Sequence, residues 1–222
     1  MSFFSDPEAA TRYAEGPVRQ VPGFRDLQKM ATILLAENAG ADAKLLVVGA
    51  GGGLELKVFA KAQPGWRFCA VDPSAPMLDQ ARVVLGPLAG QVDFHVGVTE
   101  TAPAGPFDGA SCLLVMHFLT RSERLSTLQA IHQRLKPGAP LVMVHHNVSA
   151  AGADTWLGRS VTFAHPGGLA KADVHKPVAM MKAKLTLLSP DEEVALLHEA
   201  GFTDVELFYA AFSFKGWVAI RP

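Results

Sequence analysis

Hydrophobic residues along the chain form short continuous runs that alternate with stretches of helical spacing. The runs rich in Val, Leu and Phe, each predicted to contain a strand, are 44–49, 67–72, 92–97, 107–119 and 139–146. Helical spacing between and around them is found at 24–38, 53–63, 74–85 and 121–135. A series in which strands alternate with helices predicts a parallel sheet that is covered by helices on both faces.

The end of the chain departs from this series. Residues 189–201 are predicted to form a helix that begins after Ser189 with Pro190 at its first position and stops at Gly201. The stretch 205–220 then alternates in polarity like the two strands of a hairpin. The sequence therefore predicts an α/β sheet whose last two strands form a closing hairpin.

Residues 147–184 show no regular period, and we interpret them as an irregular insert over the carboxyl edge of the sheet, where open α/β folds bind ligands. The N-terminal stretch, with its predicted helix, is expected to cover the same edge. We thus predict one domain over 1–222, with cap elements at 1–40 and 147–186.

Composition limits the class of protein. The 222 residues are 49% hydrophobic and carry a net charge of −1, which fits a sizeable core and argues against a long nucleic-acid footprint. No apolar run is long enough to span a membrane, and the N-terminus does not resemble a signal peptide, so we expect a cytoplasmic protein. Cys69 and Cys112 lie in apolar runs and are expected to be buried and reduced. The sequence does not determine the oligomeric state, and we retain a homodimer as an alternative.

The stretch "VVGAGGG" joins the first predicted strand to the following helix. Glycine there permits positive φ and close approach of a ligand, and we expect the turn to point free N–H groups at a nucleotide. A phosphate-binding loop would need Gly-Lys-Ser/Thr, which is absent, and the dinucleotide fingerprint would need glycine where Leu54 stands. Asp72 ends the second strand, where an acid accepts hydrogen bonds from ribose hydroxyls. The alternatives are a turn built only for packing, a structural Asp72 and a nicotinamide-dependent oxidoreductase.

These segments resemble the motifs of class I S-adenosylmethionine (SAM)-dependent methyltransferases. The resemblance is carried by "VVGAGGG", "VDPSAPMLDQA", "GVTETAPAGPFDGASCLLVMHFL" and "RLKPGAPLVM", in the family's order over roughly residues 40–145. It implies a Rossmann-like sheet of seven strands, mostly parallel with an antiparallel last strand, and SAM as the cofactor. It also implies that Cys69 and Cys112 do not pair. The residues that it assigns to SAM are Gly49, Ala50, Gly51, Gly53, Asp72, Pro73, Met77, Val98 and Thr99.

A narrower resemblance covers most of the chain. "VPGFRDL" and "LLHEAGFTDVELFYAAFSFKGWVAI" are similar to the carboxy-SAM synthases, which make carboxy-SAM from SAM and prephenate. The chain departs from them at matching cofactor positions, with Phe24 for a tyrosine and Leu113 for an asparagine. The arginine that holds the added carboxylate in these relatives is matched by Val178, with Lys176 close by.

Two acids of the broader family are also missing. Val47 stands two residues before the first glycine, and Val98 follows the third strand, where the family has a residue that meets adenine. We expect Val98 and Thr99 to meet adenine through the backbone instead. For Glu55, a solvated acid in the first turn of a helix is favoured over a polar role near the methionine end of SAM.

The candidate chemistry is methyl transfer to a small-molecule acceptor, which depends mainly on proximity and alignment. His117 and His146 end two predicted strands and are the candidates for a catalytic base, although a structural role is favoured for each histidine. No metal-ligand spacing is present, so no metal site is expected. Trp156, Phe163 and Met180-Met181 are expected to wall the pocket. Carboxy-SAM synthesis, a non-catalytic SAM-binding protein, and tRNA or protein methylation remain as alternatives.

Overall fold

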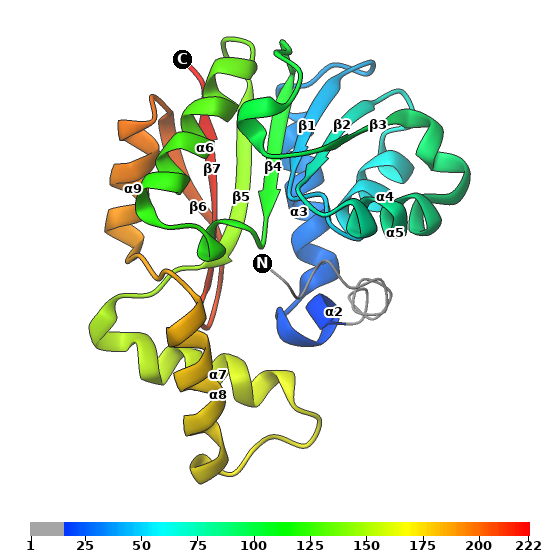
Figure 1. Ribbon diagram of the computed structural model, residues 1–222. Coiled ribbons are helices and arrows are strands. Elements are labelled where there is room, and N and C mark those ends of the chain that lie inside the picture. Colours follow the sequence, from blue (N-terminus) through cyan, green and yellow to red (C-terminus); the bar gives the residue numbers. More distant parts are fainter. Residues whose placement is uncertain (1–15) are drawn as a thin grey trace.

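The computed structural model describes residues 16–222, the side chain of Lys171 excepted, and has three layers with helices on both faces of a central sheet (Figure 1). The sheet has seven strands in the order β3-β2-β1-β4-β5-β7-β6. Its strands are β1 (Lys44–Val48), β2 (Arg67–Asp72), β3 (Val92–Val96), β4 (Gly109–Leu113), β5 (Pro140–His146), β6 (Thr203–Ala211) and β7 (Phe214–Ile220). Only β7 runs antiparallel to its neighbours, so the predicted fold class is confirmed.

The helices fall where the spacing of hydrophobic residues places them over most of the chain. They are α2 (Gly16–Gln20), α3 (Phe24–Ala36), α4 (Leu54–Ala62), α5 (Ala75–Leu85), α6 (Arg121–Arg134), α7 (Ala153–Ala164), α8 (Lys171–Lys184) and α9 (Pro190–Glu199). Capping boxes begin two of them, at Thr120 before α6 and at Ser189 before α9.

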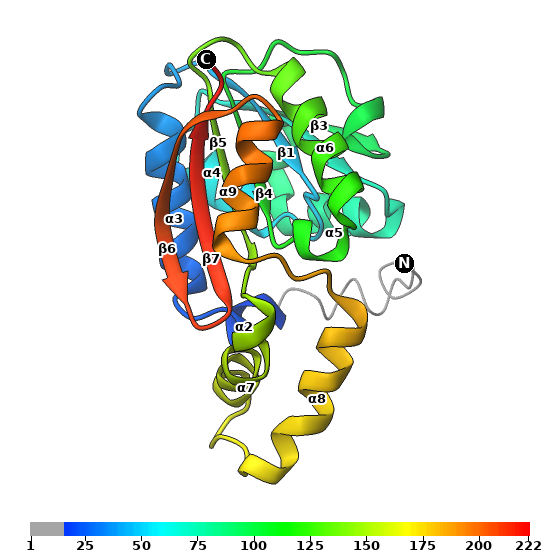
Figure 2. The same cartoon turned by 90° about the vertical axis from the view of Figure 1, so that its left-hand side faces the viewer.

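Side chains that alternate along the strands divide the core into two layers. Leu45 and Val47 of β1 point to the layer that contains α3, α4 and α5, whereas Leu46 and Val48 point to the layer that contains α6 and α9. Figure 2 shows the sheet edge-on, with α3 on one side and α6 and α9 on the other. The strands are nearly continuous apolar runs because both of their faces are buried.

The order of the strands reverses between β1 and β4. β1 leads to β2 and β3 on one side of the sheet, whereas β4 leads to β5, β7 and β6 on the other side. The segments that leave the carboxyl ends of β1 and β4 therefore diverge and leave room between them, which is where such sheets bind ligands. The glycine-rich turn follows β1 at this point, and His117 lies in the 3₁₀ helix η4 (Met116–Phe118) after β4.

The segment 147–184 is not irregular, as the sequence suggested, because it contains α7 and α8. These two helices project beyond the carboxyl edge of the sheet (Figures 1 and 2). They share a small apolar cluster that is separate from the two main layers and consists of Val148, Ala153, Leu157, Val161 and Val178. The extension is thus a helical unit with its own core.

The predicted position of the N-terminal helix was wrong. α3 packs on a face of the sheet against α4 and β5 rather than across the carboxyl edge, because Leu27, Ala31 and Leu35 form an apolar stripe that joins the main core. The short α2 is the N-terminal element that lies near α7. The division into one domain with two cap elements remains a prediction.

Two other expectations concern cysteines and membranes. Cys69 and Cys112 are both buried and free, and β1 separates their strands. Burial raises the pKa of both thiols, so they are packing residues in the layer beneath α6 and α9. Among the described residues, no helix has the length and apolar character that crossing a bilayer requires.

Candidate functional site

The turn after β1 is built from glycines with positive φ. The φ angles of Gly49, Gly51 and Gly53 are 67°, 46° and 75°, which side-chain-bearing residues rarely adopt. A Cβ on Gly49 would lie 2.1 Å from the side chain of Val115, and one on Gly53 would lie 2.9 Å from Ala81. Gly49 therefore allows tight packing of the turn against the segment after β4, and Gly53 allows tight packing against α5.

Most backbone N–H groups of this turn form hydrogen bonds within the fold, which corrects the sequence-based expectation at every position of the turn except Gly52. Gly49 and Ala50 donate to the carbonyl of Val71, Gly51 donates to Asp72, and Gly53 donates to Ala50. The carbonyl oxygens of Gly49, Gly51 and Gly52 accept no hydrogen bond from the described residues. A turn that offers carbonyl oxygens suits a cationic ligand better than a phosphate.

Asp72 stands where the sequence predicted a ribose-binding acid. Its Oδ2 accepts from Gly51 N–H at 2.9 Å and its Oδ1 accepts from Ser74 N–H at 2.8 Å. A carboxylate has about four acceptor sites, so one on each oxygen remains available for a ribose hydroxyl. Burial raises the pKa of Asp72, and the two backbone donors oppose that rise. The structural and the ligand-binding roles of this side chain are therefore compatible.

Glu55 is not the solvated acid that was favoured from the sequence. The residue is only 8% exposed, although it lies in the first turn of α4 directly after the glycines. Burial raises its pKa to about 8, and the nearby charge of Asp72 also raises it. Two acidic side chains thus lie on either side of the turn, and Glu55 is largely neutral at physiological pH because its pKa is about 8.

The adenine side of the predicted site is less polar. Val98 is 49% exposed, whereas Thr99 is buried as the first residue of the 3₁₀ helix η3 (Thr99–Thr101). Both carbonyl oxygens are occupied, by Thr101 and by Ala102, so only the N–H groups of Val98 and Thr99 are without a partner among residues 16–222. A backbone contact to adenine at this point can use these two N–H donors and the second acceptor site of the Thr99 carbonyl.

The other predicted cofactor residues surround the same edge. Met77 is buried at the start of α5 and Pro73 is exposed just before it. Leu113 ends β4, and Phe24 begins α3; both side chains are buried in the layer that contains α3. The last two side chains are apolar, and the structure encloses them as packing residues.

His117 and His146 come together at the carboxyl edge, with ring centres 5.0 Å apart. The backbone N–H of His146 donates to Nδ1 of His117 at 3.3 Å, and Nδ1 of His146 lies 2.8 Å from the Ser213 hydroxyl. Burial lowers the pKa of His117 well below its usual value, and burial with the neighbouring His145 lowers that of His146 to about 3. Both rings are therefore neutral at physiological pH.

A buried charged network beneath these histidines was missed from the sequence. Arg124 Nη1 lies 2.8 Å from Glu193 Oε2, His145 Nε2 lies 3.0 Å from the same oxygen, and Asn147 Nδ2 donates to it at 3.3 Å. Arg124 also donates to the carbonyls of Leu119 and Thr186. The network joins α6, α9 and β5 to the segment that returns from α8. The sequence did contain one indication of this network. Arg124 lies on the same face of α6 as Leu128 and Ile131, so a charged residue interrupts an apolar stripe.

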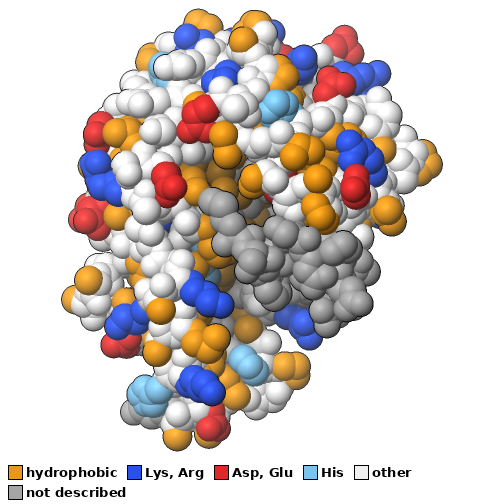
Figure 3. Space-filling view, in the orientation of Figure 1, with side chains coloured by type: hydrophobic (Ala, Val, Ile, Leu, Met, Phe, Trp, Pro, Cys, Tyr) orange, Lys and Arg blue, Asp and Glu red, His pale blue; other side chains and the backbone are white. Residues whose placement is uncertain are grey.

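A groove runs between η4 and α8, next to His117. Its volume is about 490 Å³, and its lining residues are Phe118, Lys176, Pro177, Met180, Met181, Lys184 and Leu185. The ring of Phe118 lies 4.3 Å from that of His117. Figure 3 shows a hollow with hydrophobic side chains near the middle of this face, above a lower lobe that carries basic ones.

The predicted apolar wall is thus only partly present at this groove. Met180 and Met181 line it, but Trp156 and Phe163 do not. The ring of Trp156 lies under Arg159, with 4.3 Å between its centre and Cζ, and Phe163 packs near Phe212. These two rings belong to the outer surface of α7.

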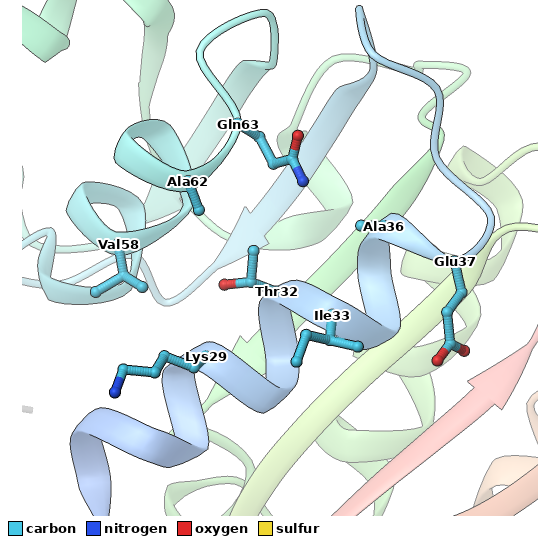
Figure 4. Close-up of a pocket in the computed structure, with 8 residues that line it drawn as sticks. All are labelled: Lys29, Thr32, Ile33, Ala36, Glu37, Val58, Ala62 and Gln63. Atoms are coloured by element: carbon cyan, nitrogen blue, oxygen red, sulfur yellow. The ribbon is translucent and has the colours of Figure 1, made fainter.

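A second hollow of about 500 Å³ lies between α3 and α4 (Figure 4). Ile33, Ala36, Val58 and Ala62 supply most of its apolar lining. α4 begins at the glycine turn and runs away from it, so a hollow that reaches the end of α4 is remote from the predicted chemistry. Its residues were not among the predicted site residues. Within residues 16–222, no group of three or more side chains is arranged to bind a metal ion.

The hydrogen-bond acceptors at the carboxyl edge of the sheet fit the polar groups of SAM. This molecule carries a sulfonium, an ammonium and two ribose hydroxyls, and the described site offers open carbonyl oxygens, a buried acid at Glu55 and spare acceptor capacity on Asp72. When bound, SAM supplies an electrophilic methyl group.

Comparisons with known proteins agree with this chemistry. A family described as a methyltransferase domain matches residues 46–141. The carboxy-S-adenosyl-L-methionine synthase of Hydrogenovibrio crunogenus is 24% identical over 209 residues, covering 91% of this chain and 83% of that protein. The synthase of Erwinia tasmaniensis is 26% identical over 226 residues, covering 97% of this chain and 90% of that protein.

A solved structure shares the fold at low identity. Human N-acetylserotonin methyltransferase in complex with SAM superposes with a TM-score of 0.71 at 14% identity. The match covers 99% of this chain but 57% of the human protein. From the family match, the shared fold and the relatives together, the chain is an enzyme of the class I SAM-dependent methyltransferase family, with S-adenosylmethionine as cosubstrate and distant homology to the carboxy-SAM synthases.

Proposed function

We propose that this enzyme transfers the methyl group of SAM to a small organic acceptor at the carboxyl edge of the sheet. The observation that carries the proposal is the groove between η4 and α8, which has an apolar lining and adjoins His117. Its volume of about 490 Å³ is in the range of small-molecule sites. Lys176 and Lys184 flank Met180 along one row of α8, so the groove has basic ends and an apolar middle.

The residues of the chain act mainly by binding and orientation. Asp72 and the carbonyls after β1 hold the cosubstrate, with Met77, Val98 and Thr99 toward its adenine. Methyl transfer is an in-line displacement in which the acceptor's electron pair forms the new bond and sulfur keeps the electrons of the old one. Because positive charge disperses during this step, alignment of the two reactants supplies most of the rate enhancement.

Carboxy-SAM synthesis is the second candidate. The relatives of this activity match 91% and 97% of the chain, which supports it. Against it, Val178 stands where the synthases have a carboxylate-binding arginine, and this side chain is buried in the small apolar cluster of α7 and α8. Lys176 lines the groove instead and is the basic side chain near that position.

Mass spectrometry of the nucleotide that co-purifies with the protein distinguishes the two candidates. We expect SAM or its demethylated product, in an amount that falls in Asp72→Ala. Carboxy-SAM in the extract would contradict methyl transfer and would favour the synthase activity. The same measurement on the Lys176→Met variant is a second test. The amount of bound carboxy-SAM is expected to depend on a basic group at this position, whereas the amount of bound SAM is not.

We further propose that the enzyme acts without nucleic acid or membrane, in the cytoplasm, with a homodimer as the one assembly kept open. The net charge of −1 supports the first part of this proposal. Ile33, 61% exposed beside the hollow between α3 and α4, is consistent with a contact between two copies. Analytical ultracentrifugation of the native protein and Ile33→Asp tests that contact.

A further inference from the structure

The protons on His117 and His146 can be assigned from their hydrogen bonds. Nδ1 of His117 accepts from the backbone N–H of His146 at 3.3 Å. A ring nitrogen that accepts a hydrogen bond carries no proton, so neutral His117 carries its proton on Nε2. His117 is therefore a hydrogen-bond donor at its other nitrogen.

The proton of His146 follows from a count of donors and acceptors. Nδ1 lies 2.8 Å from the Ser213 hydroxyl, and that hydroxyl lies 2.6 Å from the hydroxyl of Ser160. Ser160 Oγ also accepts from the backbone N–H of Ser213 at 3.2 Å. If Nδ1 of His146 donated to Ser213, one of the two buried hydroxyls, that of Ser213 or that of Ser160, would have no acceptor among the described residues.

The opposite order satisfies both hydroxyls and Nδ1 of His146, and leaves over only the Nε2–H of His146, which is not among the fully buried polar atoms without a partner. Ser160 then donates to Ser213, and Ser213 donates to Nδ1 of His146. A buried hydroxyl without an acceptor costs about 1–3 kcal/mol, which favours this order. The proton of neutral His146 is consequently on Nε2, as it is in His117.

The two rings thus form a pair of N–H donors rather than a pair of bases. Nε2 of neither histidine forms a hydrogen bond with a described residue, and neither atom is among the fully buried polar atoms without a partner, so both nitrogens are accessible to a ligand. Burial, together with His145, His146 and Arg124 around His117 and His145 beside His146, keeps the rings neutral. Glu193 is the buried acid in this region, and it is paired with Arg124 and His145.

We propose that His117 and His146 bind a carbonyl or carboxylate oxygen of the acceptor through their Nε2–H groups, and that neither accepts the acceptor's proton. The two rings are neighbours, with their centres 5.0 Å apart, and this closeness is the basis for the proposal that one carboxylate group meets both donors. The identity of this ligand as the methyl acceptor rests on the proposed function. An acceptor without a base must arrive as an anion or lose its proton to water.

The tautomers are tested first, by long-range ¹H–¹⁵N correlation on the full chain with ¹⁵N-labelled histidine. Both residues are expected to show a protonated Nε2 and an unprotonated Nδ1 between about pH 6 and about pH 8. A proton on Nδ1 of either ring, or on both nitrogens of one ring, overturns the proposal. Ser213→Ala removes the donor to His146 and is expected to change the tautomer of that residue alone.

The ligand is tested by titrating the protein, saturated with the demethylated product of SAM, with benzoate, benzamide and benzylamine. Benzoate and benzamide are expected to shift both Nε2–H resonances, and benzylamine is not. His146→Leu is expected to weaken benzoate binding about tenfold or more, whereas His146→Gln, which keeps an N–H donor, stays near the native value.

Benzoate that leaves both resonances unchanged in a protein that binds the demethylated product overturns the donor pair and leaves the proposed function intact. Failure of the product to bind would instead contradict the proposed function, and the response of the histidines to benzoate would still decide the donor pair.

Discussion

At the scale of single residues, two acids define the polar part of the site in different ways. Asp72 organises the glycine turn through Gly51 and Ser74 and retains acceptor capacity for a ligand. Glu55 is buried next to the turn and has no positively charged partner among the described residues. The first residue is expected to act on cosubstrate affinity, and the second on the dependence of stability on pH.

Asp72→Ala is expected to weaken SAM binding by about 1–3 kcal/mol, because hydrogen bonds to the ribose hydroxyls are lost. Isothermal titration calorimetry measures the change. Asp79→Ala is the matched control, since this acid is exposed on α5 and pairs only with Arg82. Equal affinity of the native protein and Asp72→Ala would contradict the role of this side chain.

Glu55→Gln is expected to gain stability relative to the native protein as the pH rises. The folded-state pKa of Glu55 is about 8, above its ordinary value of 4.5, so the native state binds more protons than the unfolded state between these values. The native protein therefore loses stability across this window, whereas the glutamine variant lacks that loss. Urea unfolding at about pH 5 and about pH 8.5 should show the difference growing by on the order of 3 kcal/mol. A difference that does not change with pH would place Glu55 in contact with water.

At the scale of elements, the buried pair of Arg124 and Glu193 joins α6 to α9. Both side chains are fully buried, and Arg124 also bonds the carbonyl of Thr186, where the chain returns from α8. Burial raises the pKa of Glu193, but His145 and Arg124 outweigh it and hold that pKa below its ordinary value. Breaking such a pair leaves a charge buried without a partner.

Arg124→Met is expected to destabilise the fold by about 3–5 kcal/mol. Arg121→Met is a matched control on the same helix, because Arg121 pairs with Glu199 at the surface and its loss should cost about 0–1 kcal/mol. Arg124→Met combined with Glu193→Leu should be less destabilised than the sum of the two single changes, because no unpaired charge remains. Additive costs in urea unfolding would exclude the coupling.

The strands and helices between residues 44 and 146 were predictable from the sequence. Their hydrophobic residues recur at regular intervals because each strand is buried on both faces and each helix packs one face on the sheet. α8 was not, since Pro177 lies inside it, Ala170 precedes it without a side-chain cap, and its apolar and charged residues are mixed. In the candidate site, Asp72 follows from its place at the end of a strand. The burial of Glu55 and the pairing of Arg124 with Glu193, 69 positions apart, depend on packing that no local pattern encodes.

At the scale of the whole molecule, the sheet and the α7–α8 extension have separate cores. Leu157 is fully buried in the cluster that the two extension helices share. One connection between the parts passes through Thr186, whose N–H donates to the carbonyl of His117 at 3.0 Å, and another joins Ser160 of α7 to Ser213. Changes in the extension are therefore expected to reach the groove before they reach the sheet.

Leu157→Ala is expected to destabilise the extension by about 2–5 kcal/mol, as other cavity-forming changes do. Hydrogen exchange should become faster in α7 and α8 and stay near native rates in the seven strands. Trp156→Ala, whose side chain is largely on the surface, serves as the control and should leave exchange nearly unchanged. Equal acceleration in the sheet would show that the molecule unfolds as one cooperative unit.

The central claim is that SAM donates its methyl group to a small organic molecule at the carboxyl edge. Incubation of the native protein with methyl-labelled SAM and a fraction of small metabolites, followed by separation of the labelled products, measures this transfer directly. We predict that a small acceptor gains label with the native protein and gains much less with Asp72→Ala. If the native protein binds SAM but labels no small molecule above the level of Asp72→Ala, the proposed methyl transfer to a small acceptor is contradicted.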